Sequence, residues 1–244
     1  MSNPAGSGAD FTLAPHHDAA RYAEIYARKG RVHIPDLFSE ADALRLFDAL
    51  AFRTAWRLML IHDGPTELTK EQWAAMPEEQ RRRIDAEVIA AGKQRFEGRF
   101  LSYRFSDHGE IYAGDPPELA ALSRFLNGRA FIDFVRAVTG AGEIQFADAQ
   151  ATLYRPGDFL HVHDDIFEQK KRHAAYVLNI TPNWKPEFGG LLAFLDENGH
   201  IDEAFTPTWN ALNLLRVPQR HFVSSVAAFG NEGRYSVTGW LRRR

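Results

Sequence analysis

Cysteine is absent from this sequence of 244 residues. Its absence excludes disulfide bonds, zinc–thiolate sites, iron–sulfur clusters and cysteine nucleophiles. No apolar run approaches the roughly 20 residues that a membrane-spanning helix needs. The N-terminal segment also contains no apolar stretch that could act as a signal peptide. We therefore expect a protein of the cytoplasm, where disulfides are rarely used for stability.

A large excess of charge of one sign is absent too. The formal net charge is −3 at pH 7, which gives no general attraction to nucleic acid or to an anionic membrane. Apolar residues make up 45% of the chain and charged residues 25%, a composition typical of a folded globular protein. One basic run, residues 242–244, follows a strand-like segment, and we interpret it as a solvated tail.

The first half of the chain carries helix signals. Capping-box patterns begin at Ser39 and Thr69, and Pro77 and Gly92 bound a charged helix. Apolar spacing predicts further helices over residues 116–126 and 130–138. Short strand candidates lie between the helices, over residues 31–35, 55–61 and 95–105.

The second half carries strand signals. Runs of strand length, separated by Pro, Gly, Asn or Asp, cover residues 144–154, 158–164, 173–180, 190–196, 210–217, 221–229 and 234–242. Seven or eight such strands are typical of a β-sandwich or a jelly-roll barrel. We therefore predict an α+β fold, with a flexible tail over residues 1–15 and one domain over 16–244. Within it, residues 16–143 would give helical support and 144–241 the barrel core.

A histidine followed two residues later by an acid could give two ligands to one metal ion, because residues i and i+2 of a strand face the same side. A histidine from another strand would complete a set of two imidazoles and one carboxylate, which leaves coordination positions open. The pattern begins four times, at His16, His108, His163 and His200. Four occurrences identify no site, so the context has to select among them.

His163 alone among the four ends a predicted strand, and the other three lie in tail, loop or turn segments. Asp165 follows it, and His221 opens a later predicted strand. We therefore predict that His163, Asp165 and His221 bind a metal ion. His161 shares their face and is a rival ligand, but it lies roughly 7 Å further along the strand from Asp165 than His163 does. We place His161 beside the mouth of the site.

Arg234 opens the last predicted strand, and Ser236, Thr238 and Trp240 share its face. A buried arginine on that face needs an anion, and a guanidinium matches a carboxylate in bidentate geometry. A dicarboxylate co-substrate would supply such an anion.

Four segments extend these patterns: YRPGDFLHVHDD (154–165), YVLNITPNWKPEFGGLLAFLD (176–196), LLRVPQRHFVSSV (214–226) and GRYSVTGWLR (233–242). Together and in this order they resemble the iron(II)/2-oxoglutarate oxygenases with a double-stranded β-helix, and within them the prolyl hydroxylases. The double acid Asp164–Asp165 and the distal-histidine segment are most similar to the branch that hydroxylates a ribosomal-protein proline.

The resemblance implies roles for single residues. His163, Asp165 and His221 would hold iron(II), and Arg234 would hold the distal carboxylate of 2-oxoglutarate. Tyr154 would hydrogen-bond this co-substrate, with a plain core tyrosine as the alternative. Pocket positions are implied for Leu192, Thr238 and Trp240, although Trp240 could equally be barrel packing. The implied cofactors are iron(II), 2-oxoglutarate and O2, with ascorbate as a further candidate.

Three functions stay open at this stage. The first is hydroxylation of a prolyl residue in a protein, and the second is hydroxylation of free proline or another small molecule. The third is a barrel without catalysis that senses a metal or binds a partner. Residues 64–107 could form a lid over a peptide groove, with contacts from Trp73, Phe96, Phe100 and Tyr103. Neither nucleic acid nor membrane is expected as a partner.

Overall fold

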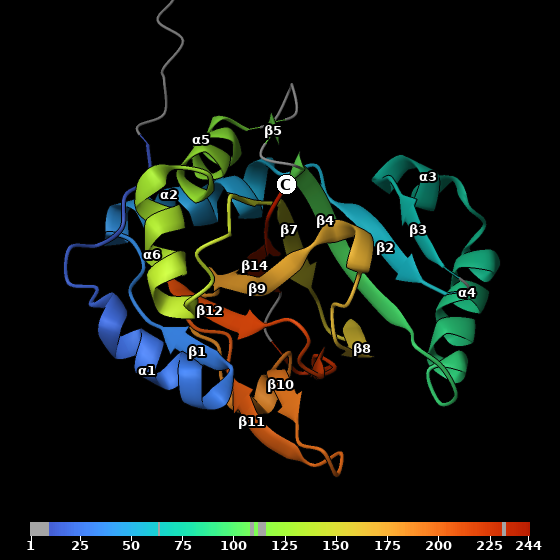
Figure 1. Ribbon diagram of the computed structural model, residues 1–244. Coiled ribbons are helices and arrows are strands. Elements are labelled where there is room, and N and C mark those ends of the chain that lie inside the picture. Colours follow the sequence, from blue (N-terminus) through green and yellow to red (C-terminus); the bar gives the residue numbers. More distant parts are fainter. Residues whose placement is uncertain (1–9, 63, 108–109, 112–115, 231–232) are drawn as a thin grey trace, which may run out of the picture.

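The computed structural model describes residues 10–62, 64–107, 110–111, 116–230 and 233–244. Its strands form two antiparallel layers that face each other (Figure 1). One layer holds, in spatial order, β12 (Ala211–Arg216), β9 (Arg172–Asn179), β14 (Arg234–Arg242) and β7 (Ala149–Tyr154). The other holds β8 (Phe159–His163), β13 (His221–Val223), β10 (Leu192–Leu195) and β11 (Ile201–Phe205). This is the arrangement of a jelly-roll barrel, so the predicted fold class is confirmed.

Strands from the first half of the chain complete the sheet. β4 (Gly98–Asp107) pairs with both β7 and β8 and so joins the two layers along one side. β1 (Arg31–Ile34) extends the first layer beyond β12. The remaining strands are short additions: β2 (Arg57–Ile61), β3 (Pro65–Leu68), β5 (Glu110–Ile111) and β6 (Phe146–Ala147). The hairpin β2–β3 pairs with the outer edge of β4.

Most helices gather on one side of the barrel. α1 (Ala19–Lys29), α2 (Glu40–Asp48), α5 (Pro117–Leu126) and α6 (Arg129–Thr139) lie against the first layer, while α3 (Lys70–Ala75) and α4 (Glu78–Ala91) lie beside β2 and β3 (Figure 1). Short π and 3₁₀ segments also occur: η1 (Ala49–Arg53), η2 (Glu168–Lys170) and η3 (Pro186–Phe188). The main core joins Phe131 and Val135 of α6 to Tyr176 and Leu178 of β9. Burial of such side chains contributes about 1.5–3 kcal/mol each.

The predicted capping boxes begin helices, as expected. The Ser39 hydroxyl accepts a hydrogen bond from the Asp42 backbone N–H at 3.2 Å. Thr69 and Gln72 form the reciprocal pair, with distances of 3.2 and 2.8 Å. Each bond satisfies a backbone donor that the first turn of a helix leaves open.

Several predicted elements and boundaries need correction. α1 was not predicted, although Asp18 caps it through the Ala20 N–H. β11 was not predicted either, because its residues alternate weakly in polarity. The barrel is not confined to residues 144–241, since β1 and β4 pair within its sheet. Pairing with a strand distant in sequence leaves little trace in a local pattern.

The predicted N-terminal tail and the strand predicted over residues 221–229 also end at other residues than expected. Phe11 is buried, with its ring centroid 5.1 Å from that of Phe38, so the flexible tail predicted over residues 1–15 does not extend to it. The strand predicted over residues 221–229 ends at Val223, because the chain then turns and Val226 forms an isolated bridge with Gly189. In the part of the chain that the structure describes, no helix is both long and apolar enough to cross a membrane.

Candidate active site

Two histidines meet on neighbouring strands. His163 ends β8 and is directly opposite His221, which begins β13, in the antiparallel register. Their ring centroids are 4.2 Å apart. The Asp165 carboxylate lies between them, 3.7 Å from the His163 Nε2 and 3.6 Å from the His221 Nε2. Ligand atoms of these three residues all lie within 4.8 Å of one another.

Asp165 reaches this position in an unexpected way. β8 ends at His163, so Asp165 does not lie on the strand face that the alternation predicted. Its φ is +65°, in the left-handed region that aspartate adopts more readily than most residues. Arg172 donates from Nη1 to the Asp165 carbonyl at 2.8 Å, which fixes this turn of the backbone. The turn brings the carboxylate toward the two imidazoles.

The hydrogen bonds of His163 and His221 leave the Nε2 of each ring free to bind a metal ion. The Nδ1 of His163 lies 2.9 Å from the His161 carbonyl, and the Nδ1 of His221 lies 2.7 Å from the Gln219 carbonyl. A carbonyl can only accept, so each Nδ1 carries the proton and each Nε2 presents a lone pair toward Asp165. Burial and the neighbouring His163 lower the pKa of His221, which favours the neutral ring. Two neutral imidazoles and a carboxylate with open positions are typical of non-haem iron(II).

His161 does not belong to this group. Its Nδ1 lies 3.3 Å from the Glu97 backbone N–H, and its ring packs on Phe159 with centroids 4.8 Å apart. It lies outside the described cluster of possible metal ligands and outside the lining of the adjacent cavity. His161 was expected as a pocket residue beside the mouth of the site, but its ring turns toward the start of β4 and does not line the cavity.

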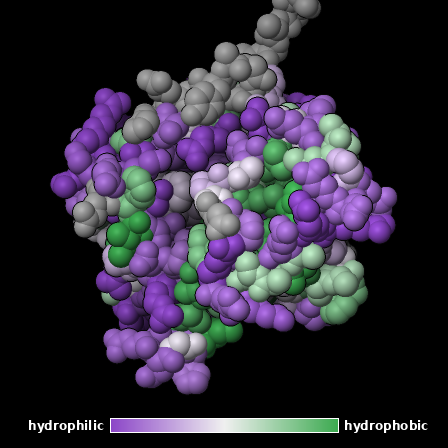
Figure 2. All heavy atoms as spheres, turned by 90° about the vertical axis from the view of Figure 1, so that its right-hand side faces the viewer, coloured by the Kyte–Doolittle hydropathy of each residue, from purple (hydrophilic) through white to green (hydrophobic). Residues whose placement is uncertain are grey.

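A cavity of about 300 Å³ extends from the three residues into the barrel. Its wall includes every other predicted site residue: Tyr154, Leu192, Arg234, Ser236, Thr238 and Trp240. On the face that carries β8, α3 and α4, hydrophobic side chains gather within a rim of hydrophilic ones (Figure 2). The site is thus a largely apolar chamber with a few polar groups, as binding sites for small molecules usually are.

Arg234 is the strongest charge inside this chamber. It is fully buried, and burial lowers the pKa of its guanidinium to about 10. At neutral pH it therefore remains a cation. Its Nε has no hydrogen-bond partner among the described residues, and its guanidinium carbon lies 5.0 Å from the centre of the Tyr154 ring. A buried cation without a paired anion is costly, so the geometry fits a carboxylate ligand.

Several hydroxyl groups lie on the strands beside Arg234. Tyr154 lies opposite Arg234 in the register of β7 and β14, and burial raises the pKa of its phenol, so the group stays protonated. The Ser236 and Thr152 hydroxyls lie 2.8 Å apart. Thr238 donates to the Tyr176 carbonyl at 3.0 Å. These groups can donate to or accept from an oxygen-rich ligand.

Gly189 and Gly190 allow the backbone to pass close to this chamber. Gly189 has φ +71°, and a Cβ there would lie 2.1 Å from the Ser225 carbonyl oxygen. Gly190 has φ +62°, and a Cβ there would lie 3.2 Å from the Arg234 Cδ. Neither position therefore has room for a side chain without a shift of its neighbours.

The region before the barrel contributes part of the wall. Phe96 and Phe100 line the cavity, whereas Trp73 and Tyr103, which were also expected there, do not. Trp73 of α3 packs in a small cluster with Leu58 and Leu60 of β2. Tyr103 packs against the main core. Sequence reasoning missed half of the lining residues, among them Met59, Ile61, Pro65 and Arg104. These four come from β2, β3 and β4, whose pairing beside the barrel had no local signal.

Comparisons with known proteins agree with this site. Residues 149–242 match the family model described as the 2OG-Fe(II) oxygenase superfamily. The prolyl 3-hydroxylase OGFOD1 of Mus musculus is 26% identical over 148 residues, which cover 57% of this chain and 26% of the relative. The chain therefore aligns with about a quarter of that protein's length.

Two solved structures share the fold. A Pseudomonas putida prolyl-4-hydroxylase superposes with a TM-score of 0.56 at 20% identity, covering 93% of this chain and 100% of that one. An oxidoreductase of the 2OG-Fe(II) oxygenase family from Burkholderia pseudomallei gives a TM-score of 0.63 at 16% identity, covering 97% and 100%.

The fold, the site and the family match agree with one another. Two imidazoles, one carboxylate and a buried arginine share one chamber inside a jelly-roll barrel. Residues 149–242, which carry all four of these side chains, are similar to the 2OG-Fe(II) oxygenase superfamily.

Proposed function

We propose that this protein is an iron(II)- and 2-oxoglutarate-dependent dioxygenase that hydroxylates a prolyl residue of a protein. The observation that carries the proposal is the fully buried Arg234, whose Nε has no hydrogen-bond partner among the described residues, in the same chamber as His163, Asp165 and His221. A metal-binding barrel without a dicarboxylate ligand would have no use for such a cation, which argues against a mere sensor or binding module.

Each residue would have a definite task. His163, Asp165 and His221 would hold the iron, and Arg234 would bind the distal carboxylate of 2-oxoglutarate while the Tyr154 hydroxyl donates to it. With iron, co-substrate and O2 bound, the site supplies the oxidation that converts a C–H bond to C–OH and 2-oxoglutarate to succinate and CO2. The apolar wall from Phe100, Leu160 and Val223 would keep water from the co-substrate.

The choice of a prolyl substrate rests on two supports. The proteins to which this chain is similar include a prolyl 3-hydroxylase and, by fold, a prolyl-4-hydroxylase. The chamber also has a wall of Met59, Ile61, Phe96 and Phe100 from elements outside the double layer. A pyrrolidine ring is apolar and compact, and it would fit such a wall.

Hydroxylation of a small molecule is the second candidate. A cavity of about 300 Å³ lies at the lower end of the range for small-molecule sites. Free proline would fill it without needing a groove for a chain. The two candidates therefore differ in whether the substrate continues beyond the chamber.

The deciding experiment supplies both kinds of substrate to one iron-loaded protein. Proline-containing peptides and free L-proline are incubated separately with 2-oxoglutarate and O2, and a gain of one oxygen atom is measured by mass spectrometry. We expect the gain on peptides, with Asp165→Ala as the inactive control. Efficient conversion of free proline, with no peptide modified, would establish the second candidate instead.

Two further expectations complete the proposal. Ascorbate should increase the number of turnovers by keeping the iron reduced, which a comparison with and without ascorbate measures. We also expect a cytoplasmic location, which cell fractionation can check.

A further inference from the structure

Two basic runs that are far apart in the sequence lie side by side in the structure. Residues 170–172 (Lys-Lys-Arg) lead into β9, and residues 242–244 (Arg-Arg-Arg) end β14. Arg172 and Arg242 are opposite each other in the register of these strands. The Arg242 Nε donates to the Lys170 carbonyl at 2.8 Å, and the Lys171 Nζ donates to the Arg244 carbonyl at 3.1 Å. We call these six residues the basic ridge.

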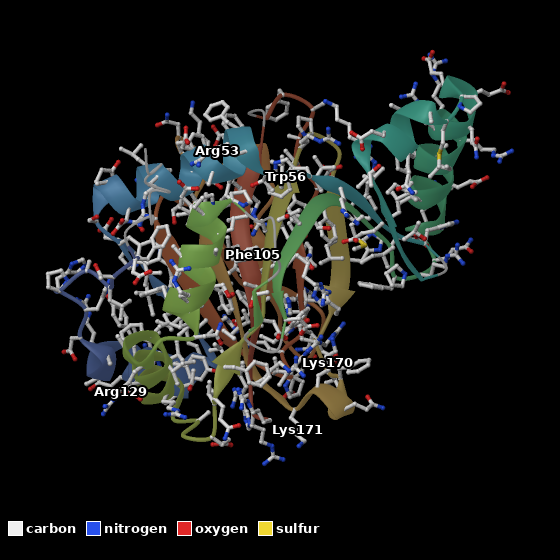
Figure 3. The ribbon with its side chains drawn as sticks, turned by 90° about the horizontal axis from the view of Figure 1, so that it is seen from above. Arg53, Trp56, Phe105, Arg129, Lys170 and Lys171 are labelled. Carbon is white, nitrogen blue, oxygen red and sulfur yellow. The ribbon has the colours of Figure 1, made fainter. Side chains whose placement is uncertain are left out.

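Acidic side chains of the described residues pair with only part of the basic ridge. Arg242 is paired with Asp148 at 2.8 Å, and Arg172 lies 3.9 Å from an Asp165 oxygen. By contrast, none of Lys170, Lys171, Arg243 and Arg244 has an Asp or Glu carboxylate within 4.0 Å among the side chains that the structure describes. Lys171, Arg243 and Arg244 are exposed. Figure 3 shows Lys170 and Lys171 together at one end of the molecule, on the opposite side of the view from Arg53 and Trp56.

The basic ridge adjoins the opening of the chamber. Lys170 lies five positions after Asp165 in the loop that leaves the metal-ligand cluster. Arg172 stacks on the ring of Trp240, with its guanidinium carbon 3.6 Å from the ring centre, and Trp240 lines the chamber. Arg104, whose Nη1 lies 3.5 Å from the Asp107 carboxylate, adds a further guanidinium to the chamber wall, with 42% of its side chain exposed.

Apolar side chains accompany the charge. Ile166 and Phe167 are 54% and 49% exposed in the loop between Asp165 and the basic ridge. The Phe167 ring lies 5.8 Å from the Lys170 Nζ and 5.7 Å from the Arg172 guanidinium carbon. Mixed apolar and cationic surface of this kind suits a polypeptide that has both acidic and apolar residues.

We propose that the basic ridge docks an acidic segment of the protein substrate, so that the residue to be hydroxylated enters the chamber beside Trp240. The inference rests on the proposed function, because it assigns the part of the substrate that lies outside the chamber. A protein partner is favoured over nucleic acid because the whole chain has a net charge of −3 and a pI near 6.4. Nucleic-acid-binding domains usually carry a general excess of positive charge.

The test uses three labelled peptides that share one central proline. Each has a flank of four glutamates, four glutamines or four lysines, and binding is measured by fluorescence anisotropy at low and high salt. We expect the glutamate peptide to bind at least tenfold more tightly than the glutamine peptide, with the difference shrinking as salt screens the charges. The double variant Lys171→Glu/Arg243→Glu should abolish the preference.

A matched control carries the same change of charge elsewhere. Arg21→Glu/Arg28→Glu alters two exposed arginines of α1, on the far side of the barrel from β8. It should keep the preference for glutamate. Both double variants should convert 2-oxoglutarate at the parent's slow rate without peptide, which shows that the site is intact.

The outcomes separate the two proposals. Equal binding of all three peptides, or loss of the preference in the α1 control as well, would overturn the docking inference, even if prolines are hydroxylated. Glutamate-dependent binding through Lys171 and Arg243 without hydroxylation of any peptide would support docking and contradict the prolyl substrate. An RNA dodecamer that binds more tightly than the glutamate peptide through these residues would replace the protein partner with nucleic acid.

Discussion

Arg234 concentrates the chemistry of the chamber in one side chain. Its guanidinium is fully buried. An anionic ligand bound beside it would offset the free-energy cost of burying that charge. We expect Arg234→Gln to weaken 2-oxoglutarate binding by about 2–5 kcal/mol, the range for removing one partner of a buried charge pair. Calorimetry on the protein loaded with Mn(II) would measure this change. The variant should still bind the metal, and an unchanged affinity for 2-oxoglutarate would remove Arg234 from the site.

Asp164 and Asp165 offer a test of the metal ligands within two adjacent residues. The Asp165 carboxylate faces both imidazoles, whereas Asp164 accepts from the Ile166 N–H at 3.0 Å. Asp165→Ala should abolish iron binding, because two remaining ligands are too few to hold the ion. Asp164→Ala should retain it, and so should His161→Ala, since its ring faces β4. Iron content after gel filtration measures all three. Loss of iron from Asp164→Ala with retention in Asp165→Ala would reverse the assignment.

At the scale of single residues, chemistry made much of the site predictable. The sequence predicted that His163, Asp165, His221 and Arg234 lie around one site, because strand ends, spacing and charge limit what such residues can do together, and the structure brings all four to one cavity. His161 was misplaced because alternation along β8 says nothing of the local turn that its ring takes toward Glu97. Asp165 lies beside the two imidazoles as predicted, but a positive φ and not the strand face brings it there.

Among the elements, β14 has the tightest packing constraint. Gly239 lies between Thr238 and Trp240, and a Cβ there would lie 1.9 Å from the Asp148 carbonyl oxygen. Gly239→Ala should therefore shift β14 against its neighbours and lower the free energy of unfolding by about 1–3 kcal/mol, as overpacking typically does. Gly142→Ala is the control, because a Cβ there meets nothing within 4 Å. Urea denaturation of both variants measures the difference, and equal stabilities would contradict the close approach.

The wall formed by β2, β3 and β4 determines what lies over the metal ligands. The Phe96 ring lies 5.8 Å from that of His163 and is 44% exposed, so it is placed to contact a substrate. Phe96→Ala should raise the KM for a peptide several-fold more than the KM for 2-oxoglutarate. Ile89→Ala, which removes a 62% exposed side chain from α4, should change neither. Steady-state kinetics measures the KM for the peptide and for 2-oxoglutarate in both variants. Equal effects of Phe96→Ala on the two KM values would mean that Phe96 does not contact the peptide.

Elements differ in how well a local pattern predicts them. α2, α3 and all strands of the second half except β11 were predicted, because caps, turn residues and apolar runs are local signals. The role of β4 was not foreseen, since its position between β7 and β8 depends on pairing with segments about 50 residues away. Cavity residues such as Arg104 of β4 and Met59 of β2 were missed for the same reason, because they reach the cavity only through this pairing.

On the scale of the whole molecule, the site connects elements from both layers of the barrel. His163 and His221 come from β8 and β13 of one layer, and Arg234 comes from β14 of the other. A metal ion and a dicarboxylate bound together would therefore hold the two layers to each other. Ligands that bind only the folded chain raise its stability by RT ln(1 + [L]/Kd).

This coupling predicts a thermal shift in two steps. Mn(II) at 100 times its Kd should stabilise the protein by about 2.7 kcal/mol, which corresponds to roughly 5–10 °C in Tm for a chain of this size. Subsequent addition of 2-oxoglutarate should raise the Tm further. Arg234→Gln should keep the first step and lose most of the second, whereas His163→Ala should lose both, because without the metal the co-substrate lacks one of its two anchors. Differential scanning fluorimetry measures these shifts. A full second step in Arg234→Gln would mean that the dicarboxylate is held from one layer alone.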